Sequence, residues 1–213
     1  MDKEMELLLT GTGFLVAGTF FSAFGATKVF ATGEDDGLAF VVKGNAIEGI
    51  GNSLQAIARE KALADREADE KELLAIIGCW FQAGGNAANA IANEMILNEV
   101  NVTDALRLNA IGSGIQSVGA SFEAYGVQDE GKGVVLGAAL ISLGSMFDAI
   151  SNLYILQDKE NTGNSIAAAG AYIEFTGALI AFIALTQLIQ TEEAEQAKEC
   201  YHYLHSSINC RRC

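Results

Sequence analysis

The 213-residue sequence has no proline, only two histidines and few aromatic residues, and each shortage excludes a class of protein. Without proline nothing forces a helix to kink, and an aromatic content of 8% is low for an all-β protein, so long uninterrupted helices are favoured. Both histidines lie near the C-terminus, so a Ser-His-Asp or Cys-His arrangement would be confined to a few local residues. The sequence therefore predicts an all-α protein that is not an enzyme.

Basic residues are scarce as well. Thirteen Lys and Arg stand against 27 Asp and Glu, which gives a net charge of −14 and a pI near 4.4. Nucleic-acid partners are excluded because binding the phosphate backbone needs clustered Lys and Arg. An apolar stretch runs from Leu7 to Ala26, but the residues before it are mainly acidic, the wrong sign for a secretory signal. We therefore expect no cleaved signal peptide.

What the sequence does contain is glycine at a regular spacing of seven residues. Eleven glycine pairs have this spacing, whereas a random arrangement of the 23 glycines would give about two, so the chain carries an internal repeat. Short polar breakers separate most segments and predict antiparallel neighbours. The charged segment 59–72 has no breaker and would be either one continuous helix or a boundary between two halves. The six expected helices cover roughly 3–30, 37–65, 68–98, 104–127, 133–157 and 163–197.

Glycine costs a helix interior roughly 1 kcal/mol relative to alanine, so its repetition indicates a compensating gain in packing. Without a Cβ atom, a neighbouring helix can approach closer than the usual distance of roughly 8–10 Å. With glycine at heptad position a, the Ile, Leu and other apolar residues at d and g form a face expected to pack against the next helix. The glycines predicted to make these packing or assembly contacts are Gly11, Gly18, Gly25, Gly44, Gly51, Gly78, Gly85, Gly112, Gly119, Gly126, Gly137, Gly144, Gly170 and Gly177.

Charged residues avoid the six inner stretches 7–27, 37–58, 73–93, 108–127, 133–157 and 162–190. These 138 residues hold five of the chain's 40 charges, whereas an ordinary domain is about one quarter charged. One explanation is a multi-pass membrane protein, since the stretches approach the roughly 20 residues that span a bilayer. The other is self-assembly into an array or filament, with outward residues packed against other copies. Many amides and a mean hydropathy of only +0.25 favour self-assembly, with the membrane protein as the alternative.

Four of the five inner charges are acids that share heptad position e: Glu48, Glu123, Asp148 and Glu174. One interpretation is a row of buried carboxylates that serves ions or protons, because acids inside a membrane mark functional sites. The interpretation that the sequence favours is a polar stripe that faces water or bonds across subunits.

The segment GNSLQAIA at 51–58 has weaker echoes in GSGIQSVG at 112–119, GCWFQAGG at 78–85 and GTFFSAFG at 18–25. This unit resembles the repeat of a family of glycine-rich, acidic, repetitive proteins of Bacillus and related spore-formers. The resemblance covers most of the chain up to about residue 190 and implies a repetitive all-helical fold. It carries over no functional site, because no activity is assigned to that family. A spore-associated or extracellular location is favoured, with a membrane as the alternative.

The segment 198–213 differs from the helical domain at 1–197. It holds Cys200, His202, His205, Cys210 and Cys213. The cysteines could form disulfides that cross-link an assembly in an oxidising setting, could bind zinc together with the histidines, or could stay reduced. No other cofactor is expected, and the expected partner is a second copy of the chain. Cys79, in an apolar segment, is expected to be a buried small hydrophobic residue.

Overall fold

The computed structural model describes residues 3–33, 36–63 and 67–209, with side chains described through Glu195 and at Lys198. These residues form helices and no strand, which confirms the all-α prediction. The helices are α1 (Lys3–Thr32), α2 (Asp36–Ala62), α3 (Glu70–Leu97), α4 (Val102–Gly126), α5 (Lys132–Ile155) and α6 (Glu160–Asn209).

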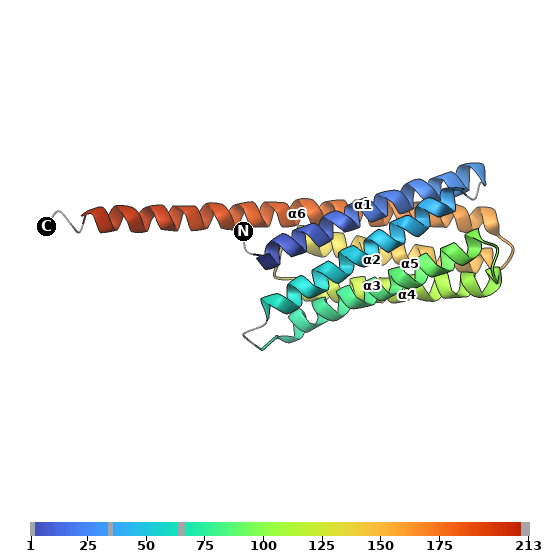
Figure 1. The fold of residues 1–213 in the computed structure, drawn as a ribbon, viewed down its shortest axis with the longest axis horizontal. Coiled ribbons are helices and arrows are strands. Elements are labelled where there is room, and N and C mark those ends of the chain that lie inside the picture. The colour runs from blue at the N-terminus through green and yellow to red at the C-terminus, as the bar shows by residue number, and fades with distance from the viewer. Residues whose placement is uncertain (1–2, 34–35, 64–66, 210–213) are drawn as a thin grey trace.

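The six helices form a closed ring. Each helix packs against its neighbours in sequence, and α6 also packs against α1. Within the described residues, no other pair of helices brings its backbones together, and only side chains meet across the ring. Figure 1 shows the antiparallel arrangement and shows α6 continuing well beyond the other five helices. Helix α6 extends past the expected end at 197 because the residues after Gly177 include no glycine or proline and many good helix formers.

The charged segment 59–72 is not one continuous helix. Helix α2 ends at Ala62, and α3 begins after Asp69. The Asp69 carboxylate accepts a hydrogen bond from the Glu72 backbone N–H at 2.9 Å, and the Asp69 N–H donates to the Glu72 carboxylate at 3.0 Å. This reciprocal pair satisfies two N–H groups that a helix start leaves free, so it defines where α3 begins. Helices α2 and α3 then pack side by side in the ring.

Reciprocal glycine contacts hold together the two helices of each hairpin. A Cβ atom added to Gly85 on α3 would lie 2.5 Å from the carbonyl oxygen of Gly112 on α4. One added to Gly137 on α5 would lie 2.6 Å from that of Gly177 on α6. No side-chain carbon fits at such distances, so these backbones approach closely only because the side chain is a hydrogen atom. The contacts join Gly11 with Gly51, Gly18 with Gly44, Gly25 with Gly37, Gly78 with Gly119, Gly85 with Gly112, Gly137 with Gly177, Gly144 with Gly170, and Gly126 with Ala75.

The prediction that positions d and g pack against the next helix is wrong for many of these residues, because they lie on the outer surface. Ile50, Val118 and Ile183 are exposed, and so are Ile115 and Leu143. A helix in a closed ring has an inner and an outer face. The glycine contact places position a against the partner helix, and the polar side chains at b and e then take the inner face.

Candidate functional site

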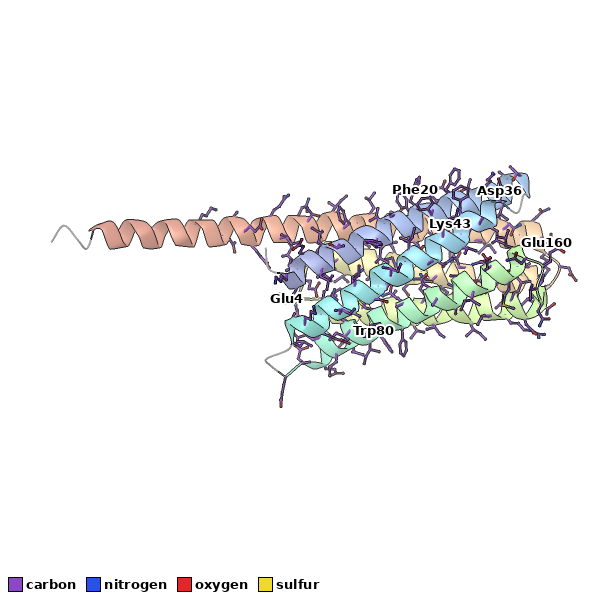
Figure 2. The ribbon with its side chains drawn as sticks, viewed as in Figure 1. Glu4, Phe20, Asp36, Lys43, Trp80 and Glu160 are labelled. Carbon is purple, nitrogen blue, oxygen red and sulfur yellow. The ribbon has the colours of Figure 1, made fainter. Side chains whose placement is uncertain are left out.

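The inside of the ring, here called the lumen, is polar, whereas the outside is covered by large apolar side chains. Glu48 is 1% exposed, while Ile111 on the outside is 60% exposed. Figure 2 shows Phe20 and Trp80 on the outer surface, and both are exposed. This is the reverse of a water-soluble bundle, whose core is apolar. The buried polar residues include Thr12, Thr19, Ser22, Asn45, Glu48, Asn52, Gln55, Gln82, Asn86, Asn89, Asn93, Asn109, Ser113, Gln116, Glu123, Ser145, Ser151, Asn152 and Glu174.

Six polar side chains, one from each helix, lie near the middle of the lumen and are here called the central layer. Each follows by four residues a glycine that contacts the partner helix of its hairpin. Ser22 Oγ donates a hydrogen bond to Glu48 Oε1 at 2.7 Å. Asn89 Nδ2 donates to Gln116 Oε1 at 3.2 Å. The central layer consists of Ser22, Glu48, Asn89, Gln116, Asp148 and Glu174.

Three carboxyl groups of the central layer, those of Glu48, Asp148 and Glu174, are close enough to interact electrostatically. Glu174 accepts a hydrogen bond from Ser145, but no ion pair among the described residues involves any of the three acids. Asp148 Oδ1 and Asn89 Oδ1 are buried and have no hydrogen-bond partner within the described part of the chain. Asn89 Oδ1 lies against Gly112 and Asp148 Oδ1 against Gly170, so each oxygen is enclosed at the helix contact of its own hairpin.

A cavity of about 340 Å³ extends from the central layer to the end of the bundle where the three hairpins turn. It is lined by the C-terminal parts of α1, α3 and α5 and the N-terminal parts of α2, α4 and α6. Asn109 Nδ2 donates to Asn93 Oδ1 at 3.0 Å and to Asn152 Oδ1 at 3.1 Å, and so joins α4 to α3 and α5. Acids line this cavity, whereas Lys, Arg and His are absent from its wall as far as the structure describes it.

On the other side of the central layer the lumen narrows. Leu15 on α1 and Ile141 on α5 pack with Ala120 and Ala178 in an apolar cluster. Beside this cluster lies a cavity of about 20 Å³. That volume has room for about one water molecule. The apolar cluster therefore separates the wide half of the lumen from the opposite end of the bundle.

Arg59 on α2 lies at this narrow end. Its guanidinium pairs with Glu130 in the connection between α4 and α5, and Nη2 lies 3.7 Å from Glu123 Oε1 on α4. Gln82 Nε2 on α3 donates to Glu123 Oε2 at 2.6 Å. Beyond Arg59 a second cavity of about 350 Å³ begins. We call Arg59, Glu123 and Glu130 the latch, because they tie three segments together across the narrow end.

The rim beside the latch carries a more exposed ion pair. Lys71 Nζ donates to Asp129 Oδ2 at 2.8 Å. This hydrogen bond raises the pKa of Lys71. The pair lies at the same end of the bundle as the latch, and the Asp129 carboxylate is largely in solvent.

The four predicted acids are inside the ring but do not form one row. Glu48, Asp148 and Glu174 belong to the central layer, whereas Glu123 belongs to the latch. Glu48, Glu123 and Glu174 are buried, and the partly exposed Asp148 lines the cavity inside the ring, so these e positions do not form a stripe on the outer surface. Sequence reasoning did not single out Arg59. Its signal is the seven-residue spacing of Asn45, Asn52 and Arg59, which places all three on one face of α2.

One cysteine prediction concerns Cys79, and the others concern the C-terminal segment 198–213. Cys79 on α3 is buried and free, as expected. Helix α6 includes the backbone of Cys200, His202 and His205, whose side chains are outside the described set. Cys210 and Cys213 lie outside the described residues altogether. Within the described residues no group of three His, Cys, Asp or Glu side chains is arranged to hold a metal ion.

Comparison with known proteins identifies a family without an assigned role. Residues 6–182 match a family of unknown function (DUF6944). No curated protein and no solved structure matches the chain. The matched span covers all of α2 to α5 and most of α1, and it ends within α6.

Proposed function

The chain belongs to the DUF6944 family of unknown function, and we propose that it is a multi-pass membrane protein whose polar lumen provides a passage for a small polar solute. The observation that carries this proposal is the closed ring with a polar inside and an apolar outside. A bilayer is the surrounding that stabilises an apolar outer surface while leaving polar groups to pair inside.

The dimensions of the apolar surface support a membrane. On α3 the exposed residues from Leu73 to Ile91 carry no charge, and they extend over about 27 Å of helix, close to the roughly 30 Å of a bilayer core. Three helices, α1, α5 and the Glu160–Glu195 part of α6, are long and apolar enough to cross a membrane. Lys43 on α2 is exposed within two turns of the helix start, so its long side chain can reach the headgroups.

The many Asn and Gln residues favour a soluble assembly when only the sequence is considered, but their positions in the structure are compatible with a membrane. Asn52, Gln82, Asn86 and Gln116 are buried inside the ring and so do not contact hydrocarbon. Small residues at helix contacts are also typical of membrane proteins, because close backbone approach replaces the hydrophobic driving force there. Both observations favour the membrane protein over the self-assembling one.

The distribution of basic residues assigns an orientation. Among the described residues, six Lys and Arg lie on the side of the N-terminus: Lys3, Arg59, Lys61, Lys71, Lys132 and Lys198. The other side has four, Lys28, Lys43, Arg107 and Lys159. Positive charge accumulates in cytoplasmic loops. We therefore place the N-terminal side, with the latch, in the cytoplasm and the wide cavity on the opposite face.

The competing proposal is a structural protein that covers the same apolar surface with other copies of itself. Two predictions from the sequence belong to this proposal. One is the resemblance to repetitive proteins of spore-formers, and the other is a cross-linking or zinc-binding role of the C-terminal cysteines. Fractionation separates the two proposals. A membrane protein stays in the membrane pellet after an alkaline carbonate wash and dissolves only in detergent, whereas fibres or sheets formed without detergent would support self-assembly.

A pair of substitutions on α4 makes this test quantitative. Ile115 and Val102 are both exposed, but Ile115 is at the middle of the helix and Val102 is at its start. Ile115→Lys should reduce membrane insertion, because a lysine at the centre of a spanning helix costs roughly 2.5–3.5 kcal/mol. Val102→Lys should insert like the wild type. Equal insertion of the two variants, measured by protease protection or glycosylation of engineered sites, would contradict the proposal.

A further inference from the structure

We infer that the protein forms a two-fold symmetric dimer in which the α6 helices of two copies pack side by side and parallel. They meet along one outward face, here called the α6 stripe, which runs along the bundle and continues beyond it. The inference goes beyond the proposed function and takes from it only the common orientation of two copies in one membrane. The α6 stripe consists of Tyr172, Thr176, Leu179, Ile183, Gln187, Gln190, Ala194, Ala197, Tyr201, Leu204 and Ile208.

The first argument is the length of α6. This helix has 50 residues, whereas α1, the longest of the other helices, has 30. Glu192 still lines a cavity of the bundle, and residues 193–209 then add roughly 25 Å of helix. Figure 1 shows this extension alone, beyond the ends of the other described helices. An isolated helix of this length is marginally stable in water, so the extension requires a packing partner.

The second argument is continuity between the extension and the outer face of the bundle. The stripe residues from Tyr172 to Ala194 are all exposed. From Gln187 to Ile208 the stripe residues follow one another at alternating intervals of three and four residues. This is the spacing of positions a and d in a coiled coil, and the helical backbone of α6 places these residues in register along one face. One partner helix can therefore cover the whole stripe.

The third argument identifies the partner as a second copy. Gln187 and Gln190 are exposed on the outer surface, in the last turns before Glu192. Glutamine side chains join helices in membranes by hydrogen bonds across the contact. Glutamine both donates and accepts, so the same residue of a second copy satisfies it. Two copies inserted in the same orientation bring each glutamine beside its counterpart.

The charges beside the stripe favour the parallel direction. With Ala194 at position a, Glu193 is at g and Lys198 is at e. In a parallel pair, position g of one helix lies beside position e of the next heptad in its partner, so these opposite charges attract. In an antiparallel pair, g lies beside g and e beside e, so like charges meet. Exposed ion pairs contribute little free energy, so these charges set the direction of pairing and the stripe supplies its strength.

Disulfide trapping tests this pairing in the purified full-length protein in detergent micelles. The background replaces the three C-terminal cysteines by serine and keeps Cys79, which is buried. Leu204→Cys should give a disulfide-linked dimer on oxidation with copper phenanthroline, because position d of one copy lies beside position d of the other in a parallel pair. Ser206→Cys is the matched control at position f and should cross-link at least tenfold more slowly. Equal rates would overturn the inference.

A second pair of variants does not depend on cysteine chemistry. Ala194→Glu would place two carboxylates against each other at position a, so the Kd of the dimer, measured by sedimentation equilibrium in micelles, should rise at least tenfold. Gln196→Glu adds the same charge at position c, away from the stripe, and should keep the wild-type Kd. All four residues involved in these changes are good helix formers, so circular dichroism should show unchanged helix content. A folded Ala194→Glu variant with the wild-type Kd would contradict the dimer.

The oligomeric state of the wild type decides the remaining outcomes. A protein that stays monomeric at every concentration reached would overturn the inference and assign the stripe to a different partner. The result is independent of membrane fractionation. A carbonate-extractable protein that dimerises through position 204 refutes the proposed function alone, and an integral protein that stays monomeric refutes this inference alone.

Discussion

Replacing Gly85 by alanine or leucine should disrupt the packing of α3 against α4, whereas replacing the adjacent Gly84 by alanine should stabilise the protein. A methyl group on Gly85 would lie 2.5 Å from the Gly112 carbonyl oxygen and 2.9 Å from the Gln116 backbone nitrogen. The obstructing atoms belong to backbone, so the helices must separate. We expect Gly85→Ala to cost about 1–3 kcal/mol or more through overpacking, and Gly85→Leu to abolish folding.

Gly84 is the matched control because it lies on the same helix turn and differs only in its surroundings. A Cβ atom at Gly84 would meet nothing within 4 Å, and the residue is exposed. Gly84→Ala should therefore stabilise the helix by roughly 1 kcal/mol, the helix propensity difference. Denaturant titration in detergent, followed by circular dichroism, measures both changes. Equal effects, or opposite signs to those expected, would show that the seven-residue glycine spacing does not set the distance between helices.

Glycine spacing was sufficient to predict the helices because it acts within a hairpin. Gly85 and Gly112 can lie in contact only because neither has a side chain, and this condition does not depend on the position of the other helices. The spacing did not indicate which face of each helix turns inward. That face is set by the closure of the ring, in which the last helix, α6, packs against the first, α1. The usual rule that apolar faces point inward assumes water outside, and Ile50 and Val118 depart from it because the outer surface of this ring is apolar.

The candidate site was predictable in part for the same reason. Shared heptad position identified the acids of the central layer, since residues seven apart lie on one face of a helix. Spacing could not separate Glu123 from the others, because its pairing with Arg59 joins α4 to α2, helices that do not pack against each other. The unpartnered oxygens of Asn89 and Asp148 depend on side-chain rotamers at the contacts with Gly112 and Gly170, which residue spacing does not specify.

Removing the Arg59 side chain should be the most destabilising change at the latch. The Arg59 side chain is only 12% exposed, and its loss would leave Glu123, itself 5% exposed, without its cation. Breaking a buried ion pair by removing one partner costs about 3–5 kcal/mol, because the remaining charge stays buried and unpaired. Arg59→Ala should therefore lower the free energy of unfolding by this amount, measured by denaturant titration in detergent. Arg59→Met combined with Glu123→Gln should recover most of the loss, since the buried charge is then gone and the Gln82 contact can be kept.

Lys71→Ala is the control for charge removal at the same end, because the Lys71 pair with Asp129 lies largely in solvent and exposed pairs contribute little. It should leave stability nearly unchanged, and comparable losses in Lys71→Ala and Arg59→Ala would contradict a buried latch. The same variants test passage through the lumen. If Arg59 obstructs the narrow end, the Arg59→Met and Glu123→Gln double variant, reconstituted in liposomes, should release trapped potassium faster than the wild type, while Lys71→Ala should not. A double variant that is folded but no leakier than the wild type would place the barrier instead at the apolar cluster of Leu15 and Ile141, which both proteins share.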